Sequence, residues 1–552
     1  MCPNLQRLGY PELRPTLGVF PIQPLRFDRQ EMIDYIDSEG QSVDVLIIGG
    51  GATGLYTALE SASRGYSTVL LERGDFASGT SSKSTKLIHG GVRYLGQGRL
   101  GLVRESLRER GLFKRNAPHL VRPVSIAIPA YSRWQYLKYS LGLMGYGALS
   151  REGGFPRART LRRKRFIGVV PGIRTSGLRG GTVFTDGQTD DARLALAIAK
   201  TAAIHGAAVL NYATVRAIRV ESGRAVGVEA HDNIDGRSLK INAKVTINAT
   251  GVHTDDTIGL GGDEASGVMR WSRGTHLVMP GSLLDGGNGL LVPDTSDGRV
   301  VFALPWLGRT LIGTTDVSVE SPDANPTAPS GDTGFLIGEV EKYLPDAGKA
   351  EVLSAFTGIR PLVSENSGGT TSKIARSHAI FVSESGLVTV AGGKWTTSRL
   401  MADQTVSKAA QVGGLSDSPS RTERLRLTGA GDAVDDDSTQ ESVVNADSLY
   451  GTEIAAIRDL EGQFPELAEP WSRGLPYRLS HAVYAIRGEM AVTLDDVMAR
   501  RTRAFLLNAT EAAEAATAVA GAISMFGGVD AGWYSRELAT IPTMLSRFRI
   551  AE

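Results

Sequence analysis

Apolar positions in this chain form two kinds of pattern, short uninterrupted runs and longer runs with helical spacing. Residues 45–48 (VLII) are an apolar run rich in β-branched side chains, which is typical of a strand buried on both faces. A helical pattern follows through Ala62, and residues 68–71 (TVLL) form a second apolar run. Strands that alternate with helices predict an open α/β sheet whose central strands are parallel.

The alternation continues along the chain and then changes. We expect a helix at 191–205, followed by strands at 208–210, 213–218 and 244–249. Between about 270 and 380, short strand-like runs dominate, which indicates an antiparallel sheet in a second domain. Residues 428–438 (TGAGDAVDDDS) are acidic and contain glycine, as in a linker, and the pattern after them is mostly helical.

The composition is that of an ordinary globular protein. The 552 residues are 41% hydrophobic and 22% charged, with a formal net charge of +1. No global charge therefore favours a nucleic acid or another acidic partner. Cys2 is the single cysteine, which excludes an internal disulfide framework and fits a reducing compartment. We predict no metal site, and no apolar run reaches the roughly 18 residues of a membrane-spanning helix.

The turn after residues 45–48 reads GGGATG, which is a dinucleotide-binding pattern. Gly49 permits the tight turn, Gly51 lets the backbone approach a pyrophosphate, and Gly54 lets the helix pack close to the strand. Glu72 ends the second strand, where a carboxylate accepts hydrogen bonds from an adenosine ribose and repels a 2′-phosphate. The order of strand, glycine turn, helix, strand and acid predicts a bound dinucleotide other than NADP.

Cationic and polar residues gather in four other segments, beside glycine, proline and apolar runs. They are residues 80–95 (TSSKSTKLIHGGVRYL), 273–276 (RGTH), 358–362 (GIRPL) with 376–378 (RSH), and 392–397 (GGKWTT). Taken singly, an arginine is usually a solvated surface charge and a histidine usually has a structural role. A buried cation, however, needs an anion to offset its lost hydration. Arginine binds phosphate or carboxylate in bidentate fashion, so the segments predict a pocket for a small anion.

These segments together resemble one known family. GGGATG, TSSKSTKLIHGGVRYL, TDDARL, NATG, RGTHLV, ALPWLGRTLIGTTD, GIRPL and AGGKWTT occur in this order, followed by SHAVYAIRGEMAVTLDDVMARRTR. The set is similar to that of the FAD-dependent, respiratory glycerol-3-phosphate dehydrogenases, and it covers roughly residues 42–540. Trp395 departs from the leucine or methionine that is common at its position, which is an apolar exchange.

The resemblance implies an α/β fold with a FAD-binding Rossmann-like domain, an antiparallel-sheet substrate domain and a C-terminal helical domain. The expected boundaries are an irregular N-terminal arm at 1–41, an oxidoreductase core at 42–415, a linker at 416–438 and a helical domain at 439–552. Within the core, FAD-binding segments are expected at about 42–130, 181–270 and 375–415, with the substrate domain mainly at 271–374.

The resemblance also implies which residues bind FAD. The ADP half is expected at Gly49, Gly51, Gly54 and Glu72. Positions along the pyrophosphate and flavin are Thr80, Ser81, Ser82, Lys86 and Leu87. Val215 should offer backbone contacts to adenine, and Gly251 should close over the nucleotide. The isoalloxazine ring is expected between Gly393, Lys394, Thr396 and Thr397.

The implied substrate is glycerol 3-phosphate, and the reaction oxidises its C2 hydroxyl to give dihydroxyacetone phosphate. A hydride passes to flavin N5, a proton passes to a base, and the electrons go on to a quinone. His276 is the first candidate base because an imidazole titrates near neutral pH; His89 and a neutral Lys394 are the alternatives. Lys394 could also stabilise the reduced flavin. Positions matching the substrate contacts are Arg93, Tyr94, His276, Arg360, Arg376 and Lys394.

Two neighbouring segments predict contact with a membrane surface. Residues 134–149 (WQYLKYSLGLMGYGAL) are apolar and aromatic, and residues 157–165 (RARTLRRKR) are basic. Aromatic anchors beside a basic patch suit an anionic bilayer surface, and the alternative is a solvated loop. With the resemblance, we expect a cytoplasmic protein attached peripherally to the cytoplasmic membrane. The predicted partners also include a second copy of the chain, as a homodimer.

Three other functions fit parts of the sequence. A glycerol-3-phosphate oxidase would use the same substrate and pass electrons to oxygen. An amino-acid oxidase or a related flavoenzyme would need one carboxylate clamp rather than several cations. A FAD-fold binding protein without catalysis, such as a prenylation escort factor, could lose the groups beside the flavin, yet Lys394, Arg360 and His276 are all present.

Overall fold

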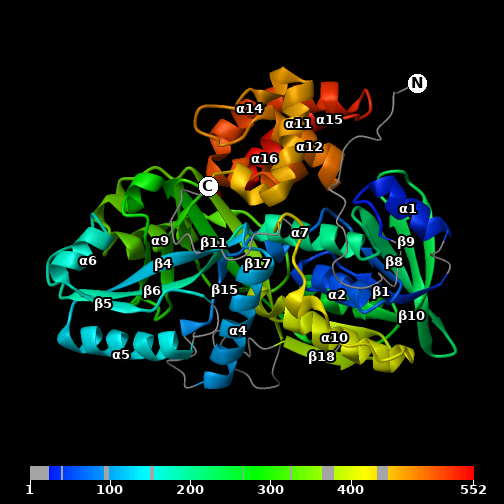
Figure 1. Cartoon of the computed structure of the whole chain (residues 1–552), viewed down its shortest axis with the longest axis horizontal. Helices are drawn as coiled ribbons and strands as arrows, with labels where there is room; N and C mark the ends of the chain where they lie inside the picture. The colour runs from blue at the N-terminus through cyan, green and yellow to red at the C-terminus, as the bar shows by residue number, and fades with distance from the viewer. Residues whose placement is uncertain are drawn as a thin grey trace.

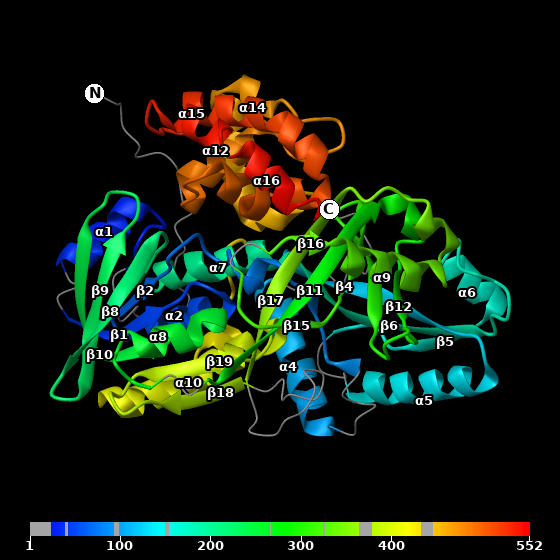
Figure 2. The same ribbon diagram turned by 180° about the vertical axis from the view of Figure 1, so that it is seen from behind.

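The computed structural model contains two large β-sheets side by side, with C-terminal helices above them (Figure 1). It describes residues 24–38, 42–92, 99–149, 154–264, 267–323, 326–363, 378–431 and 445–551. In both views the C-terminal helices, orange to red, lie on the opposite side of the molecule from helix α5 (Arg133–Leu149) (Figure 2). In the part of the chain described, no helix has the length and apolar character needed to cross a membrane.

The first sheet contains the parallel strands expected around the glycine turn. Its order is β18-β19-β10-β1-β2-β7, with β8 and β9 joined to β10. The strands are β1 (Val43–Ile48), β2 (Thr68–Leu71), β7 (Ala207–Leu210), β8 (Ala213–Glu221), β9 (Arg224–Asp232), β10 (Ser238–Asn248), β18 (His378–Val382) and β19 (Val388–Gly392). Helices α2 (Ala52–Ser63), α7 (Asp191–Ile204) and α10 (Ser398–Gly413) share its core. Because β2 and β7 are buried at every position, their sequences are continuous apolar runs.

The second sheet is antiparallel, as predicted, except for the parallel pair β12–β4; its order is β15-β11-β14-β13-β12-β4-β6-β3, with β17 on β11 and β5 on β6. Its strands are β3 (Leu87–Ile88), β4 (Val121–Ala130), β5 (Arg159–Arg162), β6 (Gly180–Thr189), β11 (Met269–Pro280), β12 (Gly289–Val292), β13 (Val301–Trp306), β14 (Arg309–Gly313), β15 (Val317–Val319) and β17 (Ser354–Val363). Strands β4 and β6 lie within segments that we expected to belong to the FAD-binding domain. They belong to this sheet because β4 pairs with β6 along its whole length and with β12.

Helices around the second sheet are α4 (Leu100–Asn116), α5, α6 (Arg163–Val169) and α9 (Ser330–Glu341); α8 (Thr254–Gly259) follows β10 of the first sheet. The short strands β16 (Ala328–Pro329) and β20 (Ile550–Ala551) pair with each other, which ties the end of the described chain to this region.

The C-terminal segment is helical, as predicted. It contains α11 (Ile454–Gln463), α12 (Leu479–Glu489), α13 (Ala504–Leu507), α14 (Ala509–Phe526), α15 (Trp533–Leu538) and α16 (Ile541–Arg547), with the π-helical turn η9 (Asp496–Arg501) between α12 and α13. Its apolar core includes Trp306 and Phe356 of the second sheet. Towards the first sheet, Arg500 and Arg501 each bond Asp75 at 2.7 Å. Burial opposes ionisation of Asp75, but the two arginines outweigh it and lower its pKa to about 2.

We predicted that residues 1–41 form an irregular arm. This prediction is wrong for residues 24–38, which are the part of the arm that the structure describes. Residues Arg29–Ser38 form helix α1. Met32, Ile33 and Ile36 lie on one face of it and are buried in the core of the first sheet. The irregular arm was predicted from the prolines earlier in the segment. The apolar face of α1 stabilises the helix because it packs on the first sheet.

Candidate active site

A cavity of about 1460 Å³ runs between the two sheets and the C-terminal helices. Its volume exceeds the 300–1,000 Å³ or so of a typical small-molecule pocket, so it has room for a dinucleotide and a second small ligand. One end is lined by the glycine turn and Glu72, and the other by His276, Arg360 and Lys394. Residues that are far apart in sequence therefore share one cavity.

The glycine turn has the close backbone approaches that the motif predicts. Gly49 has φ +109°, a conformation that favours glycine. A Cβ at Gly54 would overlap the carbonyl oxygen of Gly49 and lie 3.0 Å from its carbonyl carbon, so α2 could not pack this close to β1. Gly51 is the N-cap of α2 and lines the cavity. The helix N-terminus beside it suits a pyrophosphate.

Glu72 lies beside the glycine turn and is held by backbone N–H groups. Its Oε2 accepts from Gly50 N at 2.6 Å, and its Oε1 accepts from Gly74 N at 2.8 Å. Burial raises the pKa of Glu72, and these two hydrogen bonds oppose the rise. Each carboxylate oxygen retains a lone pair for a ribose hydroxyl.

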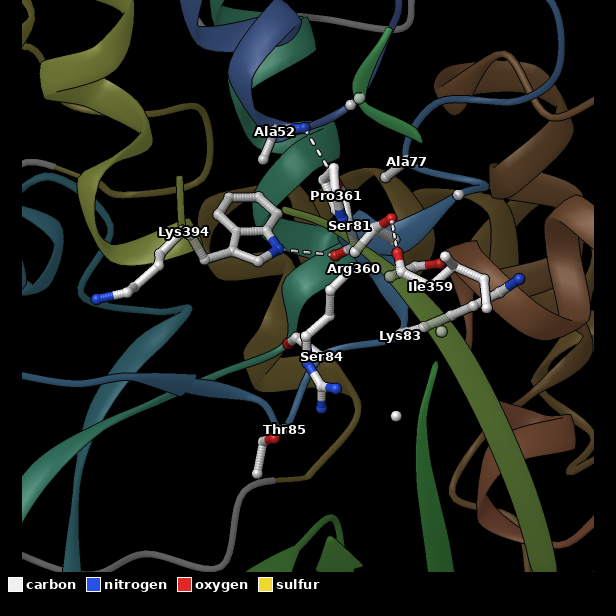
Figure 3. Close-up of a pocket in the computed structure, with 18 of the residues that line it drawn as sticks. Ala52, Ala77, Ser81, Lys83, Ser84, Thr85, Ile359, Arg360, Pro361 and Lys394 are labelled. Atoms are coloured by element: carbon white, nitrogen blue, oxygen red, sulfur yellow. Dashed lines mark hydrogen bonds between the residues drawn. The ribbon is translucent and has the colours of Figure 1, made fainter. Parts of the chain in front are cut away.

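The turn η1 (Thr80–Ser82) crosses the middle of the cavity and is fixed from three sides (Figure 3). Ser81 Oγ accepts from Ala52 N at 3.0 Å, and the Ser81 carbonyl accepts from the Trp395 indole at 2.8 Å. Thr80 donates its hydroxyl hydrogen to the carbonyl of Ile359 on β17. The cavity is also lined by Ser82, Leu87, Val215 and Gly251. Gly251 has φ +60°.

Lys86, which we expected to lie along the pyrophosphate and flavin, is not among the described residues that line the cavity. Its ammonium group is fully buried and donates to Asp191 at 2.8 Å and to the Ser82 carbonyl at 2.8 Å. Arg503 from the C-terminal segment donates to the same carbonyl at 3.0 Å. Burial and the charge of Arg503 lower the pKa of Lys86 to about 8. Lys86 therefore supports η1 from behind the cavity wall.

The segment after β19 brings Lys394 into the cavity. Gly392 and Gly393 have φ +73° and +87°, so the chain turns sharply before Lys394. Lys394 and Lys83 point to opposite sides of η1 in Figure 3. Thr396 lines the cavity and its hydroxyl accepts from the backbone N–H of His89, which also lines it. Thr397 is buried beneath, with its hydroxyl near the Lys394 carbonyl and Met401 sulfur.

His276 projects from β11 into the cavity and is fixed on three sides. Its ring stacks on Phe356 with centroids 4.9 Å apart, and its Nε2 lies 2.9 Å from the Thr85 hydroxyl. A Cβ at Gly313, opposite it on β14, would lie 2.8 Å from Nε2. Burial, with the charges of Arg360 and Lys86, holds the pKa of His276 well below 6.5. The imidazole is therefore neutral at neutral pH, as a base must be.

Arg360 reaches into the cavity from β17. Its Nη2 donates to Thr314 Oγ1 at 2.8 Å and to the Thr315 carbonyl at 3.0 Å, while Nη1 lies 3.6 Å from Asp316. Nη1 also donates to Ser272 Oγ at 3.4 Å, and the side chain, which is 29% exposed, lines the cavity. Arg93, Tyr94 and Arg376, the other predicted substrate residues, lie outside the described residues.

The comparisons with known proteins agree with this geometry. Residues 44–406 match the model of the FAD dependent oxidoreductase family, and residues 420–531 match the C-terminal domain of alpha-glycerophosphate oxidase. The mitochondrial glycerol-3-phosphate dehydrogenase of Homo sapiens is 38% identical over 501 residues, which are 86% of this chain and 69% of that protein. A protein of Caenorhabditis elegans named probable glycerol-3-phosphate dehydrogenase, mitochondrial, is 38% identical over 526 residues, which are 91% of this chain and 72% of that protein.

The chain belongs to the FAD dependent oxidoreductase family, among its glycerol-3-phosphate dehydrogenases. The solved structure of the glycerol-3-phosphate dehydrogenase from Bacillus halodurans, complexed with FAD, matches this chain with a TM-score of 0.75. The two chains are 29% identical, and the match covers 95% of this chain and 98% of that one. The residues present fit the cofactor, because a Cβ at Gly54 would block the turn and Glu72 is already oriented beside it. The predicted membership of the FAD-dependent glycerol-3-phosphate dehydrogenases and the predicted cofactor FAD are thus confirmed.

Three contacts around the cavity were not predicted from the sequence. Trp395, treated as an apolar exchange, links η1 to the Lys394 turn through its indole N–H. Thr85 contacts the imidazole of His276, although its motif gave no sign of which hydroxyl would do so. Arg503 joins the C-terminal helices to the loop behind the cavity. Only the concentration of arginines in residues 500–503 could have suggested this last contact.

Proposed function

We propose that this chain oxidises sn-glycerol 3-phosphate to dihydroxyacetone phosphate with FAD and passes the electrons to a quinone at a membrane surface. The observation that supports the proposal most is the single cavity with a dinucleotide turn at one end and Arg360, His276 and Lys394 at the other. A phosphorylated alcohol supplies an anion that Arg360 and Lys394 can bind and a hydroxyl for the neutral imidazole of His276.

FAD, when bound, supplies the hydride acceptor. Arg360 binds the phosphate, and its bonds to Thr314 and Thr315 fix the plane of the guanidinium. His276 accepts the proton of the C2 hydroxyl. Its low pKa reflects burial beside two cations, and an incoming phosphate offsets those charges, so substrate binding raises its proton affinity. Lys394 stays the alternative base and the cation that stabilises developing negative charge.

The proposed membrane contact is the outer face of α5. Trp134, Leu137, Leu141 and Met144 recur at helical spacing and are 70%, 51%, 62% and 61% exposed. A helix with an exposed apolar stripe of this kind suits the interface of a bilayer. Exposed basic residues lie on the neighbouring β5 and α6, namely Arg159, Arg162, Arg163, Lys164 and Arg165. They complement anionic lipid headgroups. We propose peripheral attachment to the cytoplasmic membrane on this side.

The inner face of the same helix supports a route for the quinone. Lys138, Tyr139 and Leu143 line the cavity, together with apolar side chains such as Phe184 and Phe302. The helix thus separates the proposed lipid surface from an apolar part of the cavity. A quinone dissolved in the bilayer would have a short path to the flavin.

The proposal is tested with purified yellow holoenzyme under anaerobic conditions. Addition of glycerol 3-phosphate should bleach the flavin and yield an equivalent amount of dihydroxyacetone phosphate. A ubiquinone analogue should then restore the absorbance. The match of residues 420–531 to an oxidase domain favours oxygen as a second candidate acceptor. Reoxidation that is faster in air than with the quinone, with peroxide formed, would favour the oxidase.

A further inference from the structure

Three adjacent strands, β17, β11 and β14, form the floor beneath the cationic end of the cavity. In their register, Ser272 is opposite Arg360, Gly274 is opposite Gly358, and His276 is opposite Phe356. Directly opposed residues of an antiparallel pair have side chains on the same face. A pair of glycines therefore separates Arg360 from His276 on the face that carries both.

The two glycines leave room for different groups. A Cβ at Gly358 would lie 2.9 Å from the Cβ of Lys83, so this glycine admits the loop that follows η1. A Cβ at Gly274 would overlap Nη2 of Arg360 and lie 2.6 Å from its Cζ. The guanidinium thus lies directly on Gly274 and is turned back along the strand towards His276.

This placement sets the spacing between the two groups. Gly274 and His276 are two residues apart, which is roughly 7 Å along a strand. The guanidinium over Gly274 keeps its bonds to Thr314 and Thr315, which lie in the loop between β14 and β15. A phosphate at the guanidinium and a hydroxyl at the imidazole are then within reach of one small substrate.

We propose that Gly274 is a positioning residue that sets the affinity for the phosphate by leaving room for the guanidinium of Arg360. A methyl group there would displace the planar head and break its bonds to Thr314 and Thr315. The backbone would tolerate the change, because Gly274 has no positive φ and the displaced atoms end a flexible side chain. The inference rests on the proposed role of Arg360 in the proposed function.

The test compares Gly274→Ala with wild type in steady-state and flavin-reduction kinetics. Since the charged contact of Arg360 with the phosphate is displaced while His276 and the cofactor keep their places, KM for glycerol 3-phosphate should rise about tenfold or more, with kcat within about threefold. The flavin content and absorbance spectrum should not change. Gly338→Ala in α9, where a Cβ meets nothing within 4 Å, is the matched control and should leave KM unchanged.

Arg360→Ala and the double variant identify the route of the effect. If Gly274 acts through Arg360, the alanine at 274 should add little once Arg360 is removed. An unchanged KM in Gly274→Ala while Arg360→Ala raises KM, or fully additive effects, would overturn the inference and leave the proposed function intact. An Arg360→Ala protein with wild-type KM would overturn both the inference and the role of Arg360.

Failure of the proposed function looks different, because the wild-type flavin would then not be bleached by glycerol 3-phosphate, and this too would overturn the inference. If Gly274→Ala does not retain FAD, Thr314→Val takes its place. It removes the hydroxyl that accepts from Arg360 at 2.8 Å and should raise KM in the same direction by a smaller factor. An unchanged KM in that variant would contradict the inference.

Discussion

The two ends of the cavity present different kinds of groups to a ligand. At the dinucleotide end, backbone groups of the glycine turn line the cavity, and even the Glu72 carboxylate is held by two backbone N–H groups. At the proposed catalytic end, the groups are side chains of His276, Arg360 and Lys394, each from a different strand or turn. Backbone recognition depends on the path of the chain, whereas side-chain recognition depends on the neighbours that hold each rotamer.

This difference has a functional consequence. A change in the glycine turn should remove the cofactor as a whole, because the backbone cannot move without the sheet. A change at the catalytic end should leave the cofactor in place and alter one kinetic constant. The variants below test that separation.

The largest effect is expected for Gly54→Ala. Its Cβ would overlap the Gly49 carbonyl oxygen, which belongs to the backbone and cannot swing away. We expect a protein that is colourless after purification, measured as flavin absorbance per protein. Gly259→Ala in α8, where a Cβ meets nothing within 4 Å, is the control and should stay yellow. A Gly54→Ala protein with full FAD content would contradict the role of this close approach.

Next in size is His276→Ala, which removes the proposed base. General base catalysis contributes about 10²- to 10⁴-fold, so kcat should fall by that order while FAD is retained. Wild-type turnover would remove His276 from the base role. In the wild type, the fall of kcat/KM at acid pH should lie well below pH 6.5, because the imidazole of the free enzyme stays neutral down to its lowered pKa. A fall centred near pH 6.5 would contradict a buried imidazole.

Arg360→Ala should have a smaller effect, about 2–4 kcal/mol in kcat/KM, because a partly buried charge contact to the phosphate is lost. Lysine should be a poor substitute because it lacks the planar fork that Thr314 and Thr315 orient. Steady-state kinetics with glycerol 3-phosphate measure both. Unchanged kinetics would mean that another group binds the phosphate.

How much the sequence predicted also differs between the two ends. Gly49, Gly54 and Glu72 were predictable because one contiguous motif contains the whole strand, turn and helix. The candidates His276, Arg360 and Lys394 could be named from their motifs, but not their neighbours. Thr85 and Phe356 meet His276 only through pairing of distant segments, and strand register is set by the whole sheet. The division of strands between the sheets was missed for the same reason.

A weaker effect is expected at the membrane face. Replacing Trp134 and Leu141 by serine removes two of the most exposed apolar side chains of α5 and should reduce flotation with anionic vesicles. Replacing Arg162, Arg163, Lys164 and Arg165 by glutamine should do the same at low salt. Neutral vesicles are the control. Flotation that neither set changes would place the membrane contact elsewhere.

The smallest effect concerns stability in acid. Burial lowers the pKa of His119 to about 3 and that of His205 to about 4. A histidine in the unfolded chain has a pKa of about 6.5. As the pH falls below that value, the imidazoles of the unfolded chain take up protons and those of the folded chain do not, so the free energy of unfolding decreases. Each histidine should cost about 1 kcal/mol between pH 6.5 and 5.5. Urea unfolding of His205→Gln should show a correspondingly shallower loss than wild type, and an identical slope would contradict this.

The central claim is that one cavity holds FAD at a backbone end and a phosphorylated alcohol at a cationic end. Anaerobic stopped-flow measurement of flavin reduction, with glycerol 3-phosphate and with glycerol at equal concentration, tests it most directly. The phosphate ester should reduce the flavin rapidly, while glycerol leaves it oxidised over the same period. Equal rates with both alcohols, or no reduction by either, would contradict the claim.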